Sequence, residues 1–146
     1  MVEIDVSYEG GLRCRATHVP SKNELITDAP ADNMGKGEAF SPTDLVATAL
    51  GTCMLTTMGI RAQERGWSLE GMRLSVEKHM TQVAPRRIAK LAVRIDVPSN
   101  PQLAATDRAF LEHTAHHCPV RISILEAIEV PVQFDWEARH TSVNGA

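Results

Sequence analysis

The sequence predicts an α+β domain in which a β-sheet wraps around one long buried helix. Three observations lead to this fold class. Short stretches near the N-terminus alternate apolar and polar residues, residues 45–60 carry no formal charge, and the second half of the chain alternates again before two helix-like segments and a final strand. Strands, helix, strands, helices and strand in this order are typical of an α+β domain.

The first part of the chain is expected to form short strands. Residues 2–8 alternate apolar and polar side chains, as a half-buried strand does, and the pair Gly10-Gly11 is a turn signal. Further strands are expected at residues 12–19 and 24–27. A loop rich in Asp, Asn, Gly and Pro follows them.

A long helix is expected from Ser41 up to a stop signal at Gly66. Ser41 can cap the helix, Pro42 suits the first helical position, and Asp44 lies three residues after the cap. Glycine is a typical residue just past a helix end. Because residues 45–60 are uncharged, this helix should be enclosed on most sides.

The second half of the chain predicts a β-hairpin, two helices and a last strand. Residues 69–80 and 88–97 alternate with a period of two and should pair as antiparallel strands. Helices are expected at residues 102–116 and from Pro119 to about residue 127, and a strand at residues 130–136.

The bulk properties favour one soluble domain spanning residues 1–146. A net charge of −3 without a basic patch argues against a nucleic-acid partner. The N-terminus lacks the features of a signal peptide, and the uncharged run is short and rich in Thr for a membrane span. With three cysteines and no export signal, a reducing, cytoplasmic location is expected.

The three cysteines lie in different settings. Cys53 lies in the enclosed helix, where an apolar environment keeps a thiol inert unless a cation or donor is near, so a purely structural role is the alternative. Cys118 directly precedes Pro119, where the amides of a helix start would activate a thiolate, and a capping cysteine without chemistry is the alternative. Cys14 shares the apolar face of its strand and is expected in the core.

Histidines cluster around Cys118. His113, His116 and His117 have helical spacing, but zinc would need further ligands from elsewhere, and no second dense cluster exists. Solvated or capping histidines are therefore expected, and no metal site.

The segment FSPTDLVATALGTCMLTTMGI, followed later by HHCPV, resembles the OsmC/Ohr family of thiol peroxidases. The shared features are a Ser-Pro-x-x-Leu helix start, one cysteine near the middle of an Ala-rich helix, and a Cys-Pro pair that opens a later helix. The resemblance implies the OsmC-like fold, an antiparallel β-sheet wrapped around a long buried central helix in an intertwined homodimer. It also implies reduction of organic hydroperoxides, a small or protein-bound dithiol as reductant, and no bound cofactor.

The resemblance assigns roles to particular residues. Cys53 would react with the peroxide to give a sulfenic acid, and Cys118 would resolve it as a disulfide, so the two thiols should be close in space. The family's activating arginine comes from the early strands, where Arg13 is preferred and Arg15 is the alternative.

One position departs from the family pattern. Well-studied members carry a Glu ten residues before the reactive cysteine, where this chain has Thr43. Asp44 and Glu38 are the acidic residues that could take its place. An apolar wall from Phe40, Leu50, Met54 and Met58 is expected to favour an organic substrate.

Three other functions remain open at this stage. The first is an OsmC-fold redox-sensing or small-molecule-binding protein with little or no peroxidase turnover, which the residue at position 43 favours. The second is a cysteine-dependent acyl transferase or hydrolase with His116 or His117 as base. The third is a domain with two unrelated thiols.

Overall fold

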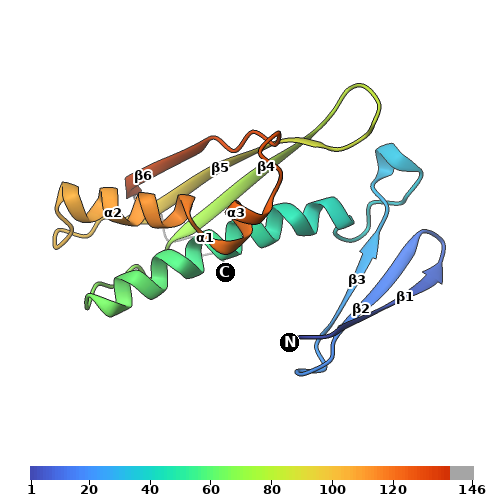
Figure 1. Ribbon diagram of the computed structural model, residues 1–146, viewed down its shortest axis with the longest axis horizontal. Helices are drawn as coiled ribbons and strands as arrows, with labels where there is room; N and C mark the ends of the chain where they lie inside the picture. The colour runs from blue at the N-terminus through green and yellow to red at the C-terminus, as the bar shows by residue number, and fades with distance from the viewer. Residues whose placement is uncertain (139–146) are drawn as a thin grey trace, which may run out of the picture. The chain divides into compact units, whose positions relative to one another are not determined.

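The computed structural model describes residues 1–138, and these form two compact units, Met1–Val46 and a second unit that begins at Ala47. Figure 1 follows the chain through its strands and helices. Strands and helices alternate as the sequence predicts, and the α+β class is confirmed. The single-domain organisation stays a prediction, and each unit is described by itself.

The first unit contains an antiparallel sheet with strand order β1-β2-β3. These strands are β1 (Ile4–Gly10), β2 (Arg13–His18) and β3 (Glu24–Asp28). Alternation places Ile4, Val6 and Tyr8 on one face of β1, where they are 60 %, 65 % and 67 % exposed. A short 3-10 helix η1 (Ala31–Asn33) interrupts the loop that follows the sheet.

Cys14 is half-buried, so its predicted place in the core is wrong. It lies on β2 opposite Tyr8 of β1 and Thr27 of β3. The alternation along β2 does predict its face correctly, because Cys14 shares a face with the apolar side chains of β1. That face is largely exposed, which alternation along one strand cannot reveal.

Helix α1 (Pro42–Glu64) begins and ends as its local sequence predicts. The amide of Ser41 donates to Asp44 Oδ2 at 2.8 Å, and the amide of Asp44 donates to Ser41 Oγ at 3.1 Å, which completes a reciprocal cap. Gly66 adopts a φ of +71° after the last turn. The amide of Trp67 then donates to the carbonyl of Ala62 at 2.9 Å and closes the helix end.

The second unit contains a mixed sheet with strand order β4-β5-β6. The hairpin of β4 (Arg73–Met80) and β5 (Ile88–Pro98) is antiparallel, as predicted. The last strand, β6 (Val132–Ala138), pairs with β5 in parallel. The chain therefore has two sheets instead of the single antiparallel sheet that was predicted. The second sheet is mixed, because the helices between β5 and β6 form a crossover that returns the chain to the starting end of β5.

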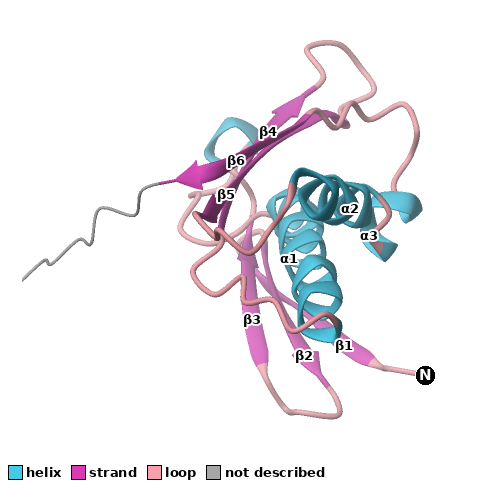
Figure 2. Cartoon of the chain, turned by 90° about the vertical axis from the view of Figure 1, so that its left-hand side faces the viewer, coloured by secondary structure: helices cyan, strands magenta, loops and turns pink. Residues whose placement is uncertain are grey.

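Helix α1 packs closely against this second sheet. Its buried side chains include Leu50, Met54 and Met58, and Figure 2 shows α1 on the same side of the β4-β5-β6 sheet as the next helix. Gly51 allows the close approach, because a Cβ there would lie 2.6 Å from Cδ2 of Leu74 on β4. By length and composition alone α1 could also cross a membrane, a test that buried helices of soluble proteins pass as well.

Two helices connect β5 to β6, and both are shorter than predicted. Helix α2 (Ala105–His116) starts late because the side chain of Asp107 accepts from the amide of Ala104 at 3.1 Å and fixes the first turn there. Helix α3 (Pro119–Ser123) ends where Ile124 turns extended. Trp136 on β6 donates its Nε1–H to Glu112 Oε1 at 2.7 Å, which ties α2 to the sheet.

Candidate active site

Two cysteines of the second unit interact with each other. Cys53 is half-buried in the middle of α1, and Cys118 is wholly buried at the N-cap of α3. The two thiols are near enough for Cys53 to contribute to the pKa of Cys118. The predicted proximity of Cys53 and Cys118 is confirmed, whereas their catalytic roles stay predictions.

Cys118 is not activated in the way that its sequence position suggests. Burial raises the pKa of the Cys118 thiol, and the interaction with Cys53 acts in the same direction. The expected amide is present, since the N–H of Arg121 donates to Cys118 Sγ at 3.4 Å, and it opposes the shift. Burial dominates because the thiol is fully shielded and α3 is only five residues long.

The two thiols differ in what each can do. A raised pKa means that Cys118 keeps its proton while it lies beside Cys53. Cys53 is the thiol that solvent reaches, since Cys118 is 0 % exposed. The pair can therefore present one accessible sulfur supported by a buried donor, with the second sulfur in place to form a disulfide.

The expected apolar wall around Cys53 is only partly right. Leu50, Met54 and Met58 are wholly buried and belong to the core of the second unit. Phe40 is exposed in the first unit. Thr57, one helical turn after Cys53, donates its hydroxyl to the carbonyl of Cys53 at 2.7 Å.

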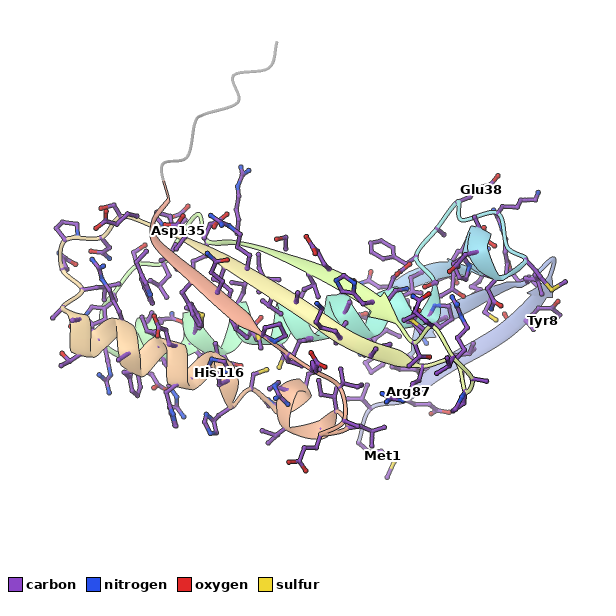
Figure 3. All side chains as sticks on the ribbon, turned by 90° about the horizontal axis from the view of Figure 1, so that it is seen from above. Met1, Tyr8, Glu38, Arg87, His116 and Asp135 are labelled. Carbon is purple, nitrogen blue, oxygen red and sulfur yellow. The ribbon has the colours of Figure 1, made fainter. Side chains whose placement is uncertain are left out.

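Arg13 lies in a cluster of acidic residues within the first unit. Its guanidinium forms an ion pair with Glu38 and lies 3.5 Å from Asp28 Oδ2. Figure 3 labels Glu38 on the loop before α1. Of the acidic residues considered as partners for an arginine, Glu38 is therefore the one that pairs with Arg13.

Asp28 is a member of this cluster that the sequence reasoning missed. Its side chain is buried, and the amide of Glu38, which donates to Asp28 Oδ2 at 3.0 Å, lowers the pKa of the carboxyl group. The charge of Arg13 adds to this effect. The signal was the β2–β3 register, which places Asp28 directly opposite Arg13.

The remaining supporting candidates have other contacts. Thr43 Oγ1 hydrogen-bonds with Ser41 Oγ at 3.1 Å, and Asp44 closes the cap of α1. Arg15 pairs with Glu9 at 2.6 Å and Glu24 at 2.8 Å, and the hydrogen bond with Glu9 is the main reason that the pKa of Arg15 is raised.

The histidines near Cys118 make contacts with their neighbours on α2 and β6. Burial, followed by the charge of Arg121, lowers the pKa of His116, which packs edge-on against Phe134. Figure 3 labels His116 on α2. His117 stacks on His113 with ring centroids 4.0 Å apart and donates Nδ1–H to the carbonyl of His113. Within residues 1–138, no group of three His, Cys, Asp or Glu side chains is placed to hold a metal ion.

The profile of the OsmC-like protein family matches residues 35–133 of this chain. A solved structure from Psychrobacter arcticus 273-4 is 43 % identical, covers 92 % of this chain and 96 % of its own, and has a TM-score of 0.84. The chain belongs to the OsmC-like family. The Psychrobacter protein is provisionally described as an osmotic stress induced and detoxification response protein.

More distant members of the family share the fold. An organic hydroperoxide resistance protein OsmC from Legionella pneumophila is 18 % identical, with a TM-score of 0.73 over 92 % of this chain and 96 % of its own. The organic hydroperoxide resistance protein OhrB of Bacillus subtilis is 13 % identical, with a TM-score of 0.66 over 92 % and 98 %. Among curated proteins, none matches this chain.

Proposed function

We propose that this chain is a thiol-dependent peroxidase that reduces organic hydroperoxides through a Cys53 sulfenic acid and a Cys53–Cys118 disulfide. Membership of a family that includes organic hydroperoxide resistance proteins supports a redox or peroxidase role. The observation that carries the finer proposal is the interaction between a half-buried Cys53 and a wholly buried Cys118.

The first step oxidises Cys53. Its thiolate attacks the distal oxygen of the hydroperoxide, the O–O bond breaks, and the alkoxide leaves as an alcohol after taking up a proton. The sulfur becomes a sulfenic acid. The S–H of Cys118 favours this step, because it donates to the sulfur of Cys53 and stabilises negative charge there.

The second step forms the disulfide. The sulfur of Cys118 attacks the sulfenic sulfur of Cys53, hydroxide leaves, and the thiol proton of Cys118 converts it to water. An external dithiol, small or protein-bound, then attacks the disulfide and is itself oxidised as both cysteines regain their thiols. This cycle requires no metal or bound cofactor.

Arg13 is proposed as the cation that favours the Cys53 thiolate, with Glu38 as the residue that holds its side chain in place. The ion pair between Arg13 and Glu38 supports this proposal, because it supplies the arginine–carboxylate pair that Thr43 cannot. Arg15 pairs with Glu9 and Glu24 and not with Glu38, so it is the weaker candidate.

A homodimer is also proposed. The support is the apolar face of β1, where Ile4, Val6 and Tyr8 are each more than half exposed. Three large apolar side chains on one strand face form a surface that association would remove from water. The family resemblance in the sequence points to the same assembly.

Peroxide turnover with lipoic acid in its reduced form tests the proposal. We expect the wild-type protein to reduce cumene or tert-butyl hydroperoxide faster than hydrogen peroxide, and the Cys53→Ser variant to have no turnover. A Cys14→Ser variant, which changes the remaining half-buried thiol, should keep the wild-type rate. Activity that survives in Cys53→Ser would contradict the assignment, and one stoichiometric oxidation without turnover would favour redox sensing.

A further inference from the structure

A groove lies between the second half of α1 and α2, beyond the thiol pair. It has a volume of about 440 Å³, and side chains from both helices line it. Helix α1 contributes Arg61 and Glu64, with Arg65 just after it, and helix α2 contributes Phe110 and His113, with His117 just after it. Neither the family match nor the thiol chemistry assigns a role to this groove.

Positive charge predominates in the groove. Two arginines face a single carboxylate, that of Glu64, which pairs with Arg61 at 2.8 Å. Arg61 and Glu64 are both about half exposed, so this pair is open to competition from another anion. The rings of His113 and His117 add further polar edges at the same place.

Arg65 is held in position by aromatic rings. Its guanidinium carbon lies 3.7 Å from the ring centroid of Phe110 and 5.2 Å from that of Trp67. Stacking fixes the plane of the guanidinium while leaving its N–H groups available to an oxyanion. Phe110 also lines the groove, so apolar surface lies beside the charged groups.

The groove continues the helix face that carries Cys53. Cys53, Thr57 and Arg61 follow one another at intervals of four residues on α1, and Thr57 lines the groove. With about 1.5 Å of rise per residue, Arg61 lies roughly 12 Å along the axis from Cys53. At the other wall, His117 directly precedes Cys118.

We propose that this groove binds the carboxylate or phosphate group of a small organic molecule whose apolar part lies on Phe110. Arg65 supplies a preoriented fork for two oxygens, and Arg61 exchanges its contact with Glu64 for one with the ligand. The site is independent of peroxide turnover, because neither cysteine lines it. The alternative ligand would be a metal ion bound by His113, His117 and Glu64. In the part of the chain that the structure describes, no three such side chains are placed to bind a metal ion.

Titration calorimetry on the full chain, under reducing conditions and at low ionic strength, tests the site with four probes. Phenyl phosphate and benzoate should bind, whereas benzyl alcohol, which has the ring without the charge, should not. Inorganic phosphate should bind more weakly than phenyl phosphate, because it makes no contact with Phe110. If inorganic phosphate binds as tightly as phenyl phosphate, the proposal that the site recognises an organic ligand is wrong.

Variants separate a built site from a general charge effect. The double variant Arg61→Gln/Arg65→Gln should lose at least tenfold in affinity for phenyl phosphate, and Arg65→Lys should lose less. Arg73→Gln removes one positive charge, half of what the double variant removes, on the face of β4 that points away from α1, and it should bind as the wild type does. Equal losses in Arg73→Gln and the double variant, or none in either, would overturn the proposal.

Glu64→Gln should change the affinity for phenyl phosphate in the opposite direction to the arginine variants. Removing this carboxylate frees Arg61, so the affinity for phenyl phosphate should rise about two- to fivefold. A lower affinity in Glu64→Gln would contradict an oxyanion site. Far-ultraviolet circular dichroism checks that each variant is folded. If the double variant does not fold, the single variants Glu64→Gln and Arg65→Lys test the proposal.

Discussion

The thiol of Cys118, buried at the start of α3, interacts with Cys53 of α1, and this neighbour adds to the rise in the pKa of Cys118 that burial causes. The relationship is unequal, because solvent reaches Cys53 and does not reach Cys118. In the proposed cycle the buried thiol is first a donor and later a nucleophile. Both tasks require that it remain protonated until Cys53 has been oxidised.

The first prediction concerns the intermediate. In Cys118→Ala, one equivalent of cumene hydroperoxide should convert Cys53 to a sulfenic acid that persists, because no second sulfur is in place to displace hydroxide. Labelling with dimedone followed by mass spectrometry should find the adduct on Cys53. Wild-type protein should instead give a Cys53–Cys118 disulfide, and a disulfide to Cys14 would contradict the assignment.

The second prediction concerns pH. Because the pKa of Cys118 is raised on folding, the unfolded thiol ionises first, near its ordinary value of 9.0, while the folded one remains protonated. Above that pH the folded state binds more protons, so the free energy of unfolding must fall as pH rises. Urea unfolding of reduced protein from about pH 8 to about pH 10 should show a steeper fall in the wild type than in Cys118→Ala. Equal slopes would show that burial does not hold the proton.

The third prediction separates the two arginines. In the proposed mechanism Arg13 favours the reactive form of Cys53, so Arg13→Ala should slow the alkylation of Cys53 by iodoacetamide at neutral pH about tenfold. Arg15→Ala should leave the rate unchanged, because Arg15 pairs with Glu9 and Glu24 and not with Glu38. Glu38→Gln should also slow the alkylation of Cys53, but less than Arg13→Ala does. The reverse order of the two arginine variants would transfer the role to Arg15.

The fourth prediction concerns assembly. Sedimentation velocity at micromolar concentration should show a dimer. Val6→Asp places a charge on the apolar face of β1 and should raise the dissociation constant of the dimer at least tenfold. Ser7→Asp places the same charge on the opposite face of that strand and should have little effect. A wild-type monomer would refute the proposed dimer.

The fifth prediction compares two glycines of α1. Nothing lies within 4 Å of a Cβ at Gly59, so Gly59→Ala should raise the free energy of unfolding by about 0.5–1 kcal/mol through helix propensity. At Gly51 the added methyl would meet Leu74 and Val76, and crowding should cancel that gain. Chemical denaturation should find Gly51→Ala about 0.5–1 kcal/mol less stable than Gly59→Ala.

Features with local causes were predictable from the sequence. The cap formed by Ser41 and Asp44, the stop at Gly66 and the alternation of β5 depend on residues a few positions apart, and the structure confirms all three. The proximity of Cys53 and Cys118 was predictable only through the family resemblance, because no local pattern links two helices so far apart in the chain.

Features with long-range causes were not predictable. The burial that reverses the expected activation of Cys118 comes from packing around α3, and the exposure of Cys14 depends on what covers the β1-β2-β3 sheet. The parallel pairing of β6 with β5 is set by the crossover. The ion pair between Arg13 and Glu38 joins a strand to a later loop, which spacing alone could not connect.

That crossover also sets the order in which the site appears during synthesis. Cys53 leaves the ribosome on α1, whereas Cys118 follows only after the β4–β5 hairpin and α2, and β6 later still. At about 5–20 residues per second, translation takes roughly 3 to 13 seconds from one cysteine to the other. For that interval every nascent chain displays Cys53, the thiol proposed to react with peroxide, without its buried partner, so oxidative damage to Cys53 should fall most heavily on newly made protein.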